Sequence, residues 1–122
     1  MKKDISEKFI VFFDFDNTIT SIDVIDNMLE RFSEDNKWKD LEKRWQHEEI
    51  GSLECLKGQV EGIRVDKETL DNYLSTVKID PYFKKLLQLF GSRDIPVLIV
   101  SDNFDYMLKG ILKKNNIPDM EV

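Results

Sequence analysis

Two short, uninterrupted apolar runs stand apart from the rest of the chain, at residues 9–13 and 96–100. Runs of this length without polar alternation are typical of strands that are covered on both faces of a sheet. We therefore expect a first strand over residues 8–13 and a second strand over residues 96–100. Residues 120–122 could begin a further strand.

Apolar residues spaced three and four apart predict six helices in the remainder of the sequence. The apolar positions that define the helices, in chain order, are Ile25, Met28, Leu29 and Phe32; Trp38, Leu41 and Trp45; Leu53, Leu56, Val60 and Ile63; Leu70, Tyr73, Leu74 and Val77; Phe83, Leu86, Leu87 and Phe90; and Phe104, Met107, Leu108, Ile111 and Leu112.

Residues that favour helix ends mark several of the expected boundaries. Good N-caps precede the first, third, fourth and fifth helices. These N-caps are Ser21 or Asp23, Ser52, Asp66 and Asp80. Pro81 suits the first turn of the fifth helix, Gly91 should end it, and the sixth helix should stop near Asn115.

The order strand, helices, strand, helix indicates an α/β protein with a parallel sheet. A single parallel crossover needs only one helix, yet about four helices precede the one that leads into the second strand. We therefore expect residues 1–20 and 79–122 to form a Rossmann-like α/β core that is only partial. Residues 21–78 should form an inserted helical cap.

Length and charge narrow the class of protein. The 122 residues suit one domain or part of one. The net charge of −6 argues against a nucleic-acid footprint, which would be basic. The first apolar run is too short for a signal peptide or a membrane helix. Cys55 is the only cysteine, so no internal disulfide can form, and we expect it in the core of a cytoplasmic protein.

Two aspartates, Asp14 and Asp16, come directly at the end of the first strand, in the string Phe-Asp-Phe-Asp-Asn-Thr. Ionised carboxylates are costly at the end of a buried strand unless a cation or hydrogen-bond donors compensate them. In an open α/β sheet this end of a strand is also where ligands bind. An acidic surface turn is the alternative, but the apolar strand that runs straight into the motif favours a metal-assisted phosphoryl-transfer site.

The acidic pair has a consistent chemistry. An aspartate such as Asp14 can attack a phosphate ester to form an aspartyl-phosphate, and Mg²⁺ would offset the charge repulsion. Asp16 can protonate the leaving alcohol and then deprotonate the attacking water. Thr18 and the backbone amides around Asn17 could hold the phosphoryl oxygens.

Ser101, Asp102 and Asn103 follow the second strand, so both strand ends should meet at one edge of the sheet. A hydroxyl there, with the amides of the following turn, is a natural phosphate contact, so we expect Ser101, Asp102 and Asn103 to bind phosphate together with Asn17 and Thr18. A helix N-cap is the alternative for Ser101. An acid such as Asp102 beside a phosphate is unfavourable unless it points away or caps the helix.

These motifs resemble those of the haloacid dehalogenase superfamily of phosphatases. Residues 14–18 look like its first motif, Asp-x-Asp-x-Thr, and Ser101 looks like its second. The helical stretch between them looks like the cap of the phosphoserine-phosphatase-like branch. The resemblance implies that Asp14 is the nucleophile and a Mg²⁺ ligand, and that Asp16 is the acid/base with its carbonyl on the metal. It implies phosphate contacts from Thr18 and Ser101.

The resemblance also suggests a substrate class, and this sequence departs from the phosphoserine-phosphatase pattern at several positions. Asp23 falls where phosphoserine phosphatases place a cap-side acid, which implies a cationic group on a small phosphorylated metabolite. Asp102 and Asn103 replace glycines that are common there, and no residue matches the substrate-carboxylate arginine convincingly. The later lysine and acidic pair of the superfamily find no match in these 122 residues.

We therefore expect a Mg²⁺-dependent phosphatase that is complete only with further sequence, and a 122-residue form that is nearly inert. A phosphomutase and a non-catalytic module that binds phosphate or a protein partner are the alternatives. No membrane partner is expected. An unpaired sheet edge would favour a homo-oligomer.

Overall fold

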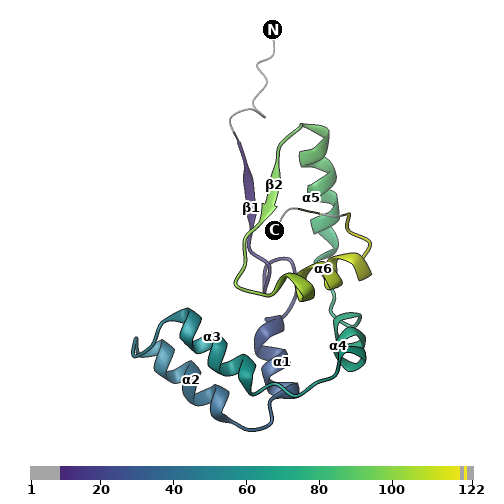
Figure 1. Cartoon of the computed structure of the whole chain (residues 1–122). Helices are drawn as coiled ribbons and strands as arrows, with labels where there is room; N and C mark the ends of the chain where they lie inside the picture. Colours follow the sequence, from purple (N-terminus) through teal and green to yellow (C-terminus); the bar gives the residue numbers. More distant parts are fainter. Residues whose placement is uncertain (1–8, 119, 121–122) are drawn as a thin grey trace. The chain divides into compact units, whose positions relative to one another are not determined.

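A computed structural model describes residues 9–118 and 120 (Figure 1). These residues form two strands and six helices, in the order that the sequence predicts. Their bounds are β1 Val11–Phe13, α1 Val24–Phe32, α2 Lys37–Gln46, α3 Ser52–Glu61, α4 Lys67–Leu74, α5 Pro81–Ser92, β2 Val97–Ile99 and α6 Asp105–Lys114. The further strand expected at residues 120–122 falls mostly outside the described residues. No helix in the described part of the chain is long and apolar enough to cross a membrane.

The chain divides into two compact units. Unit 1 consists of residues 1–23 and 71–122 and holds both strands, α5 and α6. Unit 2 consists of residues 24–70 and holds α1, α2 and α3. The boundary falls inside α4, so unit 2 is shorter than the helical insertion of residues 21–78 that the sequence predicts. The cap role of that insertion stays a prediction.

Unit 1 is organised around a two-stranded parallel sheet. The register pairs Phe12 with Leu98 and Phe13 with Ile99. Because paired residues of parallel strands point to the same face, Phe13 and Ile99 share the covered face. The Phe13 ring lies 5.1 Å from Phe83 and 6.4 Å from Phe90 of α5, between ring centroids. Ile99 is only 1% exposed, so this face forms part of the core of unit 1.

Helix α5 begins as its sequence predicts and ends slightly later. The Asp80 carboxylate accepts the backbone N–H of Tyr82 at 2.8 Å, and Pro81 occupies the first turn. The helix continues to Ser92, with Arg93 as its C-cap, so the stop predicted at Gly91 is wrong by one residue. Gly91 has open space around it and no positive φ, so nothing there requires a glycine.

Within unit 1, α6 is attached to residues 71–77 by polar contacts. Tyr106 Oη donates to the Asp71 carboxylate at 2.5 Å, and Lys114 Nζ donates to the Asp71 carbonyl at 2.9 Å. Asn115 Nδ2 donates to the Val77 carbonyl at 3.1 Å. The hydrogen bond to Asp71 raises the pKa of Tyr106, because it stabilises the protonated phenol.

Unit 2 contains a close pair of helices, α2 and α3. A Cβ added at Gly58 would lie 2.8 Å from Leu41 Cδ1, so the absence of a side chain allows the close approach. Gln59 is 4% exposed and donates to the Trp38 carbonyl at 3.1 Å and to Glu42 at 3.0 Å. Cys55 is buried as predicted; burial and then the nearby Glu42 charge raise the pKa of its thiol.

Two details of α3 differ from the sequence-based expectation. The N-cap is Gly51 rather than Ser52, whose Oγ instead accepts the Trp45 indole N–H at 3.0 Å. Leu53, expected on the apolar face, is 68% exposed. The first apolar position of this helix therefore does not contribute to a core.

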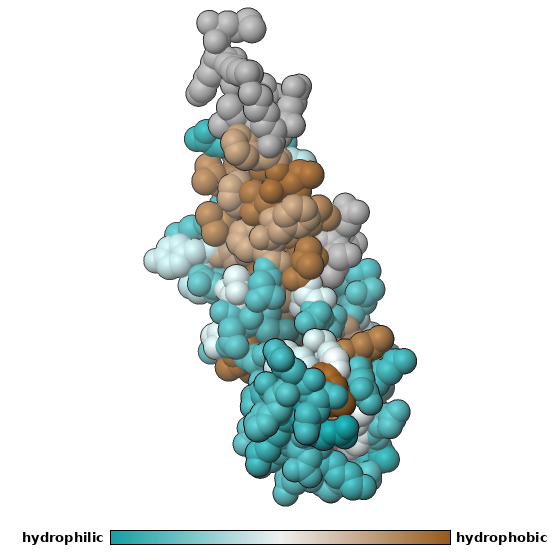
Figure 2. Space-filling view, turned by 90° about the vertical axis from the view of Figure 1, so that its left-hand side faces the viewer, coloured by the Kyte–Doolittle hydropathy of each residue, from teal (hydrophilic) through white to brown (hydrophobic). Residues whose placement is uncertain are grey.

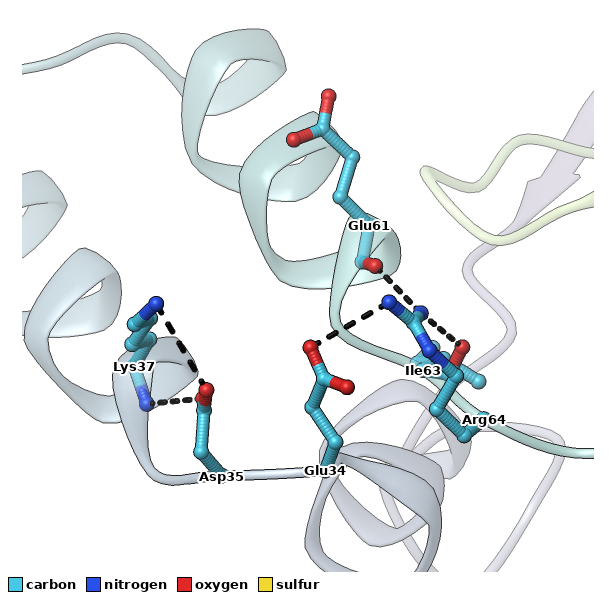
Figure 3. Close-up of polar contacts among 6 residues, drawn as sticks. All are labelled: Glu34, Asp35, Lys37, Glu61, Ile63 and Arg64. Atoms are coloured by element: carbon cyan, nitrogen blue, oxygen red, sulfur yellow. Dashed lines mark hydrogen bonds and ion pairs between the residues drawn. The ribbon is translucent and has the colours of Figure 1, made fainter.

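Polar contacts also close one end of unit 2 (Figure 3). The Arg64 guanidinium donates to the backbone carbonyls of Glu61 and Ile63, at 2.8 and 2.9 Å, and pairs with Glu34 at 3.3 Å. Asp35 accepts the backbone N–H of Lys37 at 2.9 Å, and its carboxylate lies 3.8 Å from Lys37 Nζ. Arg64 therefore stabilises the end of α3 through groups of its own unit.

Candidate active site

The two strands of unit 1 end at the same edge of the sheet. The last register pair joins Phe13 to Ile99, and the Val100 N–H continues the ladder by donating to the Phe13 carbonyl at 2.9 Å. Asp14 therefore leaves β1 beside the point where Ser101 leaves β2. Because the strands are parallel, this is the carboxyl edge, where ligands of open α/β sheets bind.

Asp14 presents its carboxylate at this edge in an exposed position. Its Oδ1 accepts the backbone N–H of Phe15 at 2.9 Å. Its Oδ2 lies 3.4 Å from the Thr18 hydroxyl, a long contact that holds the side chain only weakly. The carboxylate is therefore oriented by its own loop and remains accessible to a ligand.

The loop after β1 is closed by backbone hydrogen bonds. The Phe15 carbonyl accepts the N–H groups of Thr18, Ile19 and Thr20, at 3.2, 2.9 and 3.1 Å. Asn17 has a φ of 61°, in the left-handed region that Asn tolerates better than most residues. The Asn17 N–H donates to the Ile22 carbonyl at 3.2 Å. The amides around Asn17, expected to hold phosphate, are thus engaged within the loop, whereas the side chains of Asn17 and Thr18 are exposed.

Thr20 organises this loop, and sequence reasoning missed it. It is 2% exposed, donates its hydroxyl to the Ile22 carbonyl at 2.6 Å and accepts the Asn17 N–H at 3.2 Å. The adjacent Ile19 carbonyl accepts the Asp80 N–H at 2.7 Å, which anchors the loop to the start of α5. The sequence feature that could have predicted this role is a hydroxyl residue two positions after Thr18, among residues that favour turns.

Asp16 and Asn103 connect the two loops directly. Asn103 Nδ2 lies 3.3 Å from both carboxylate oxygens of Asp16. Asp16 is half-buried and Asn103 is 6% exposed. The structure therefore brings the predicted acid/base residue against the loop that carries Ser101.

The other predicted site residues take distinct places. Ser101 is half-buried, and its Oγ accepts the backbone N–H of Asn103 at 3.0 Å, which leaves its own proton for another acceptor. Asp102 is exposed, and the N-cap position of α6 belongs to Phe104, so Asp102 does not cap that helix. Asp23 directly precedes α1 and is half-buried.

The carboxylates at this edge suit Mg²⁺ in chemical type, because Mg²⁺ prefers oxygen ligands. Asp14, through its exposed carboxylate, and Asp16, through its backbone carbonyl, are the residues that would hold the ion. Across residues 9–118 and 120, however, no three His, Cys, Asp or Glu side chains gather at one place. The oxygen ligands of Asp14 and Asp16 fit Mg²⁺ in chemical type, but they are few.

This sheet, with the acidic loop and Ser101 at its carboxyl edge, has the haloacid dehalogenase-like α/β fold. The chain is similar in structure to a HAD family hydrolase, t0658, from Salmonella enterica serovar Typhi, with a TM-score of 0.78 and 12% identity over 93% of this chain and 39% of that one. It is similar in sequence to a phosphoserine phosphatase from Archaeoglobus fulgidus, with 27% identity over 101 residues, or 82% of this chain. No protein-family profile matches.

These comparisons confirm the resemblance predicted from the two motifs. They also limit it, since the chain spans 29% of the length of the Archaeoglobus phosphatase and 39% of the Salmonella hydrolase. The roles of individual site residues remain predictions.

Proposed function

We propose that the chain carries the nucleophile and acid/base portion of a Mg²⁺-dependent phosphatase, acting on small phosphate monoesters in the cytoplasm. The supporting observation is the exposed carboxylate of Asp14 at the carboxyl edge of β1, in the same loop as Asp16, which contacts Asn103 of the loop after β2. The similarity to a phosphoserine phosphatase supports the same class of reaction. The single cysteine, which can form no internal disulfide, supports the compartment.

The reaction would proceed in two displacements. An oxygen of Asp14 attacks phosphorus, and the bond from phosphorus to the leaving oxygen breaks as Asp16 transfers a proton to that oxygen. Water then attacks the aspartyl-phosphate while Asp16 takes its proton, and inorganic phosphate leaves with both carboxyl groups restored. Bound Mg²⁺ would supply charge neutralisation. The Ser101 hydroxyl, whose oxygen already accepts the Asn103 N–H, would donate to a phosphoryl oxygen.

The decisive experiment is Asp14→Asn in the natural full-length polypeptide, assayed with p-nitrophenyl phosphate and Mg²⁺. Turnover should fall by at least about 10³-fold, because loss of a nucleophile removes the covalent route. The matched control is Asp40→Asn, an exposed acid on α2 that should leave turnover unchanged. An Asp14→Asn protein with substantial turnover, and no deamidation by mass spectrometry, would remove Asp14 from this role.

Substrate choice is proposed to involve Asp23, whose carboxylate would favour esters that carry an amino group. Asp23→Ala should lower kcat/KM for amino-containing phosphomonoesters several-fold and leave neutral ones nearly unchanged. An equal effect on both substrate types would instead reduce Asp23 to a residue that supports the start of α1.

A non-catalytic module that binds phosphate or a protein partner is the second candidate. The small set of oxygen donors in the described residues favours it, because so few ligands hold Mg²⁺ weakly. The 122-residue chain alone is expected to be nearly inert. Robust Mg²⁺-dependent turnover by this chain would show that the catalytic groups are all present in it.

A further inference from the structure

The side chain of Asn103 is the buried polar group that joins the two loops of the candidate site. It comes from the loop after β2, whereas Asp16 comes from the loop after β1. Its amide nitrogen is equidistant, at 3.3 Å, from Oδ1 and Oδ2 of Asp16. One donor group therefore contacts both oxygens of the carboxylate.

The orientation of the Asn103 amide is fixed by a second contact. Its Oδ1 accepts the backbone N–H of Phe104 at 2.7 Å, which is a short, well-formed hydrogen bond. Because a backbone N–H can only donate, the oxygen end of the amide must face Phe104 and the NH₂ end must face Asp16. The backbone N–H of Asn103 is also used, on Ser101 Oγ. The residue is thus held from both ends.

These contacts argue against a direct phosphate contact from the Asn103 side chain. Both polar ends of its amide are engaged, and the residue is 6% exposed. A side-chain amide also does not ionise near neutral pH, so it cannot compete with Asp16 as an acid. What it can do is restrict the rotamers of a half-buried carboxylate that must meet a substrate oxygen.

We propose that Asn103 is a positioning residue that holds the carboxylate of Asp16 for proton transfer, a role that rests on the proposed phosphatase function. Proton transfer requires hydrogen-bond distance and alignment with the reacting oxygen. A carboxylate free to rotate would reach that geometry in a smaller share of encounters. The loss should therefore fall on kcat for substrates whose leaving group needs a proton, with KM little changed.

Kinetics of Asn103→Asp and Asn103→Ala in the natural full-length polypeptide test the role. Asp keeps the shape of Asn but replaces the donor with an acceptor, so it separates donation from space filling. We expect kcat for an alkyl phosphate to fall by about 10²-fold, the scale of a small misplacement in an active site. With p-nitrophenyl phosphate, whose leaving group needs little protonation, the fall should be much smaller.

Asn115→Asp is the matched control. Asn115 also uses its amide NH₂ in unit 1, but on the carbonyls of Val77 and Ile111 rather than on a carboxylate. This variant should lower the midpoint of thermal unfolding without changing the ratio of the kcat values for the two substrates. Two results would overturn the positioning role. One is an equal change, in both variants, of the ratio of kcat for the alkyl ester to kcat for the nitrophenyl ester. The other is an equal loss of kcat with both esters in Asn103→Asp.

A second measurement needs no turnover. In ¹⁵N-labelled 122-residue chain, the side-chain NH₂ signals of Asn103 are those that Asn103→Asp removes. They should shift in Asp16→Ala and stay in place in Asp40→Ala. Unshifted signals in Asp16→Ala would overturn the contact itself. A wild-type polypeptide that hydrolyses no phosphate ester would instead overturn the proposed function, and the positioning role with it, even if the contact is seen.

Discussion

The two units of the chain use buried polar groups differently. In unit 1, Asn103 and Thr20 are almost fully buried, and their hydrogen bonds support the loops that carry Asp14 and Asp16. In unit 2, the buried Gln59 bonds a carbonyl and an acid of the neighbouring helix. The buried polar groups of unit 1 thus support carboxylates at the edge of the sheet, whereas the buried Gln59 of unit 2 links two helices to each other.

The surfaces of the two units also differ. On the face of the sheet opposite α5, Ile10, Phe12 and Val100 are 55%, 62% and 60% exposed. Figure 2 shows hydrophobic surface gathered over the strands and hydrophilic surface over α2 and α3. Helix α2 has no buried residue. Because exposed apolar patches of this kind mark contact surfaces, we expect association through this face of unit 1.

The largest effect that separates the units should come from Asp16→Asn. Loss of a general acid/base costs about 10² to 10⁴-fold in rate, and the loss should be greatest with unactivated alkyl phosphates. Glu61→Gln, an exposed acid of α3 in unit 2, should have no such effect. Steady-state kinetics in the natural full-length polypeptide with an alkyl and a nitrophenyl ester measure both.

Aspartyl-phosphate should still form in Asp16→Asn with the nitrophenyl ester, because nitrophenolate leaves without a proton. Acid quenching and mass spectrometry would detect the added phosphoryl group. If Asp16→Asn lost activity equally with both esters, Asp16 would not be the acid/base, and the functional contrast between the units would rest on Asp14 alone.

The apolar face of unit 1 should drive self-association of the 122-residue chain. Phe12→Ser should shift the chain toward monomer in light scattering, because it removes the most exposed aromatic ring of the strands. Leu53→Ser is the matched control, since Leu53 is 68% exposed but lies on α3 of unit 2. A wild-type chain that is monomeric at high concentration, or equal shifts in both variants, would contradict the difference in surface.

Element order was the most predictable part of the fold. In the described part of the chain, apolar spacing located six helices, because each helix carries enough apolar positions to define a face. The apolar runs located two strands, but the expectation that both faces are covered is wrong, since Phe12 is 62% exposed. The helix caps at Asp66 and Asp80 were also predictable, since a carboxylate at that position bonds the next free N–H groups. Leu53 was not, because periodicity shows which face a residue shares but not whether anything covers that face.

The candidate site was predictable in its chemistry but not in its internal contacts. Asp14, Asp16 and Ser101 could be placed at one edge because each follows an apolar strand. The bond from Asn103 to Asp16 joins residues 87 positions apart, so no local pattern encodes it. The same holds for Thr20, whose burial depends on how the loop folds back on Phe15 and Ile22.

The smallest expected effect concerns Asp66, an acid of unit 2 with a purely structural place. Its carboxylate accepts the Thr69 backbone N–H at 2.7 Å, and this hydrogen bond lowers the pKa of Asp66 from its ordinary value of 3.8. A carboxyl group whose pKa is lower in the folded state stabilises the fold above its unfolded pKa. That stabilisation is lost as the pH falls through the folded pKa.

Asp66→Asn retains a capping side chain but removes the titration. Wild type should therefore be slightly more stable than the variant at neutral pH, and the difference should shrink as the pH falls below the ordinary pKa of 3.8 and vanish below the lower folded pKa. Urea unfolding midpoints measured from neutral pH to below that value would show the convergence. Because Asp66 is exposed, added salt should shrink the difference further. A difference that grew toward acid pH would contradict the assigned hydrogen bond. A loss of phosphatase activity in Asp66→Asn would contradict the expectation that Asp66 only caps helix α4 and that the proposed catalytic residues lie in unit 1.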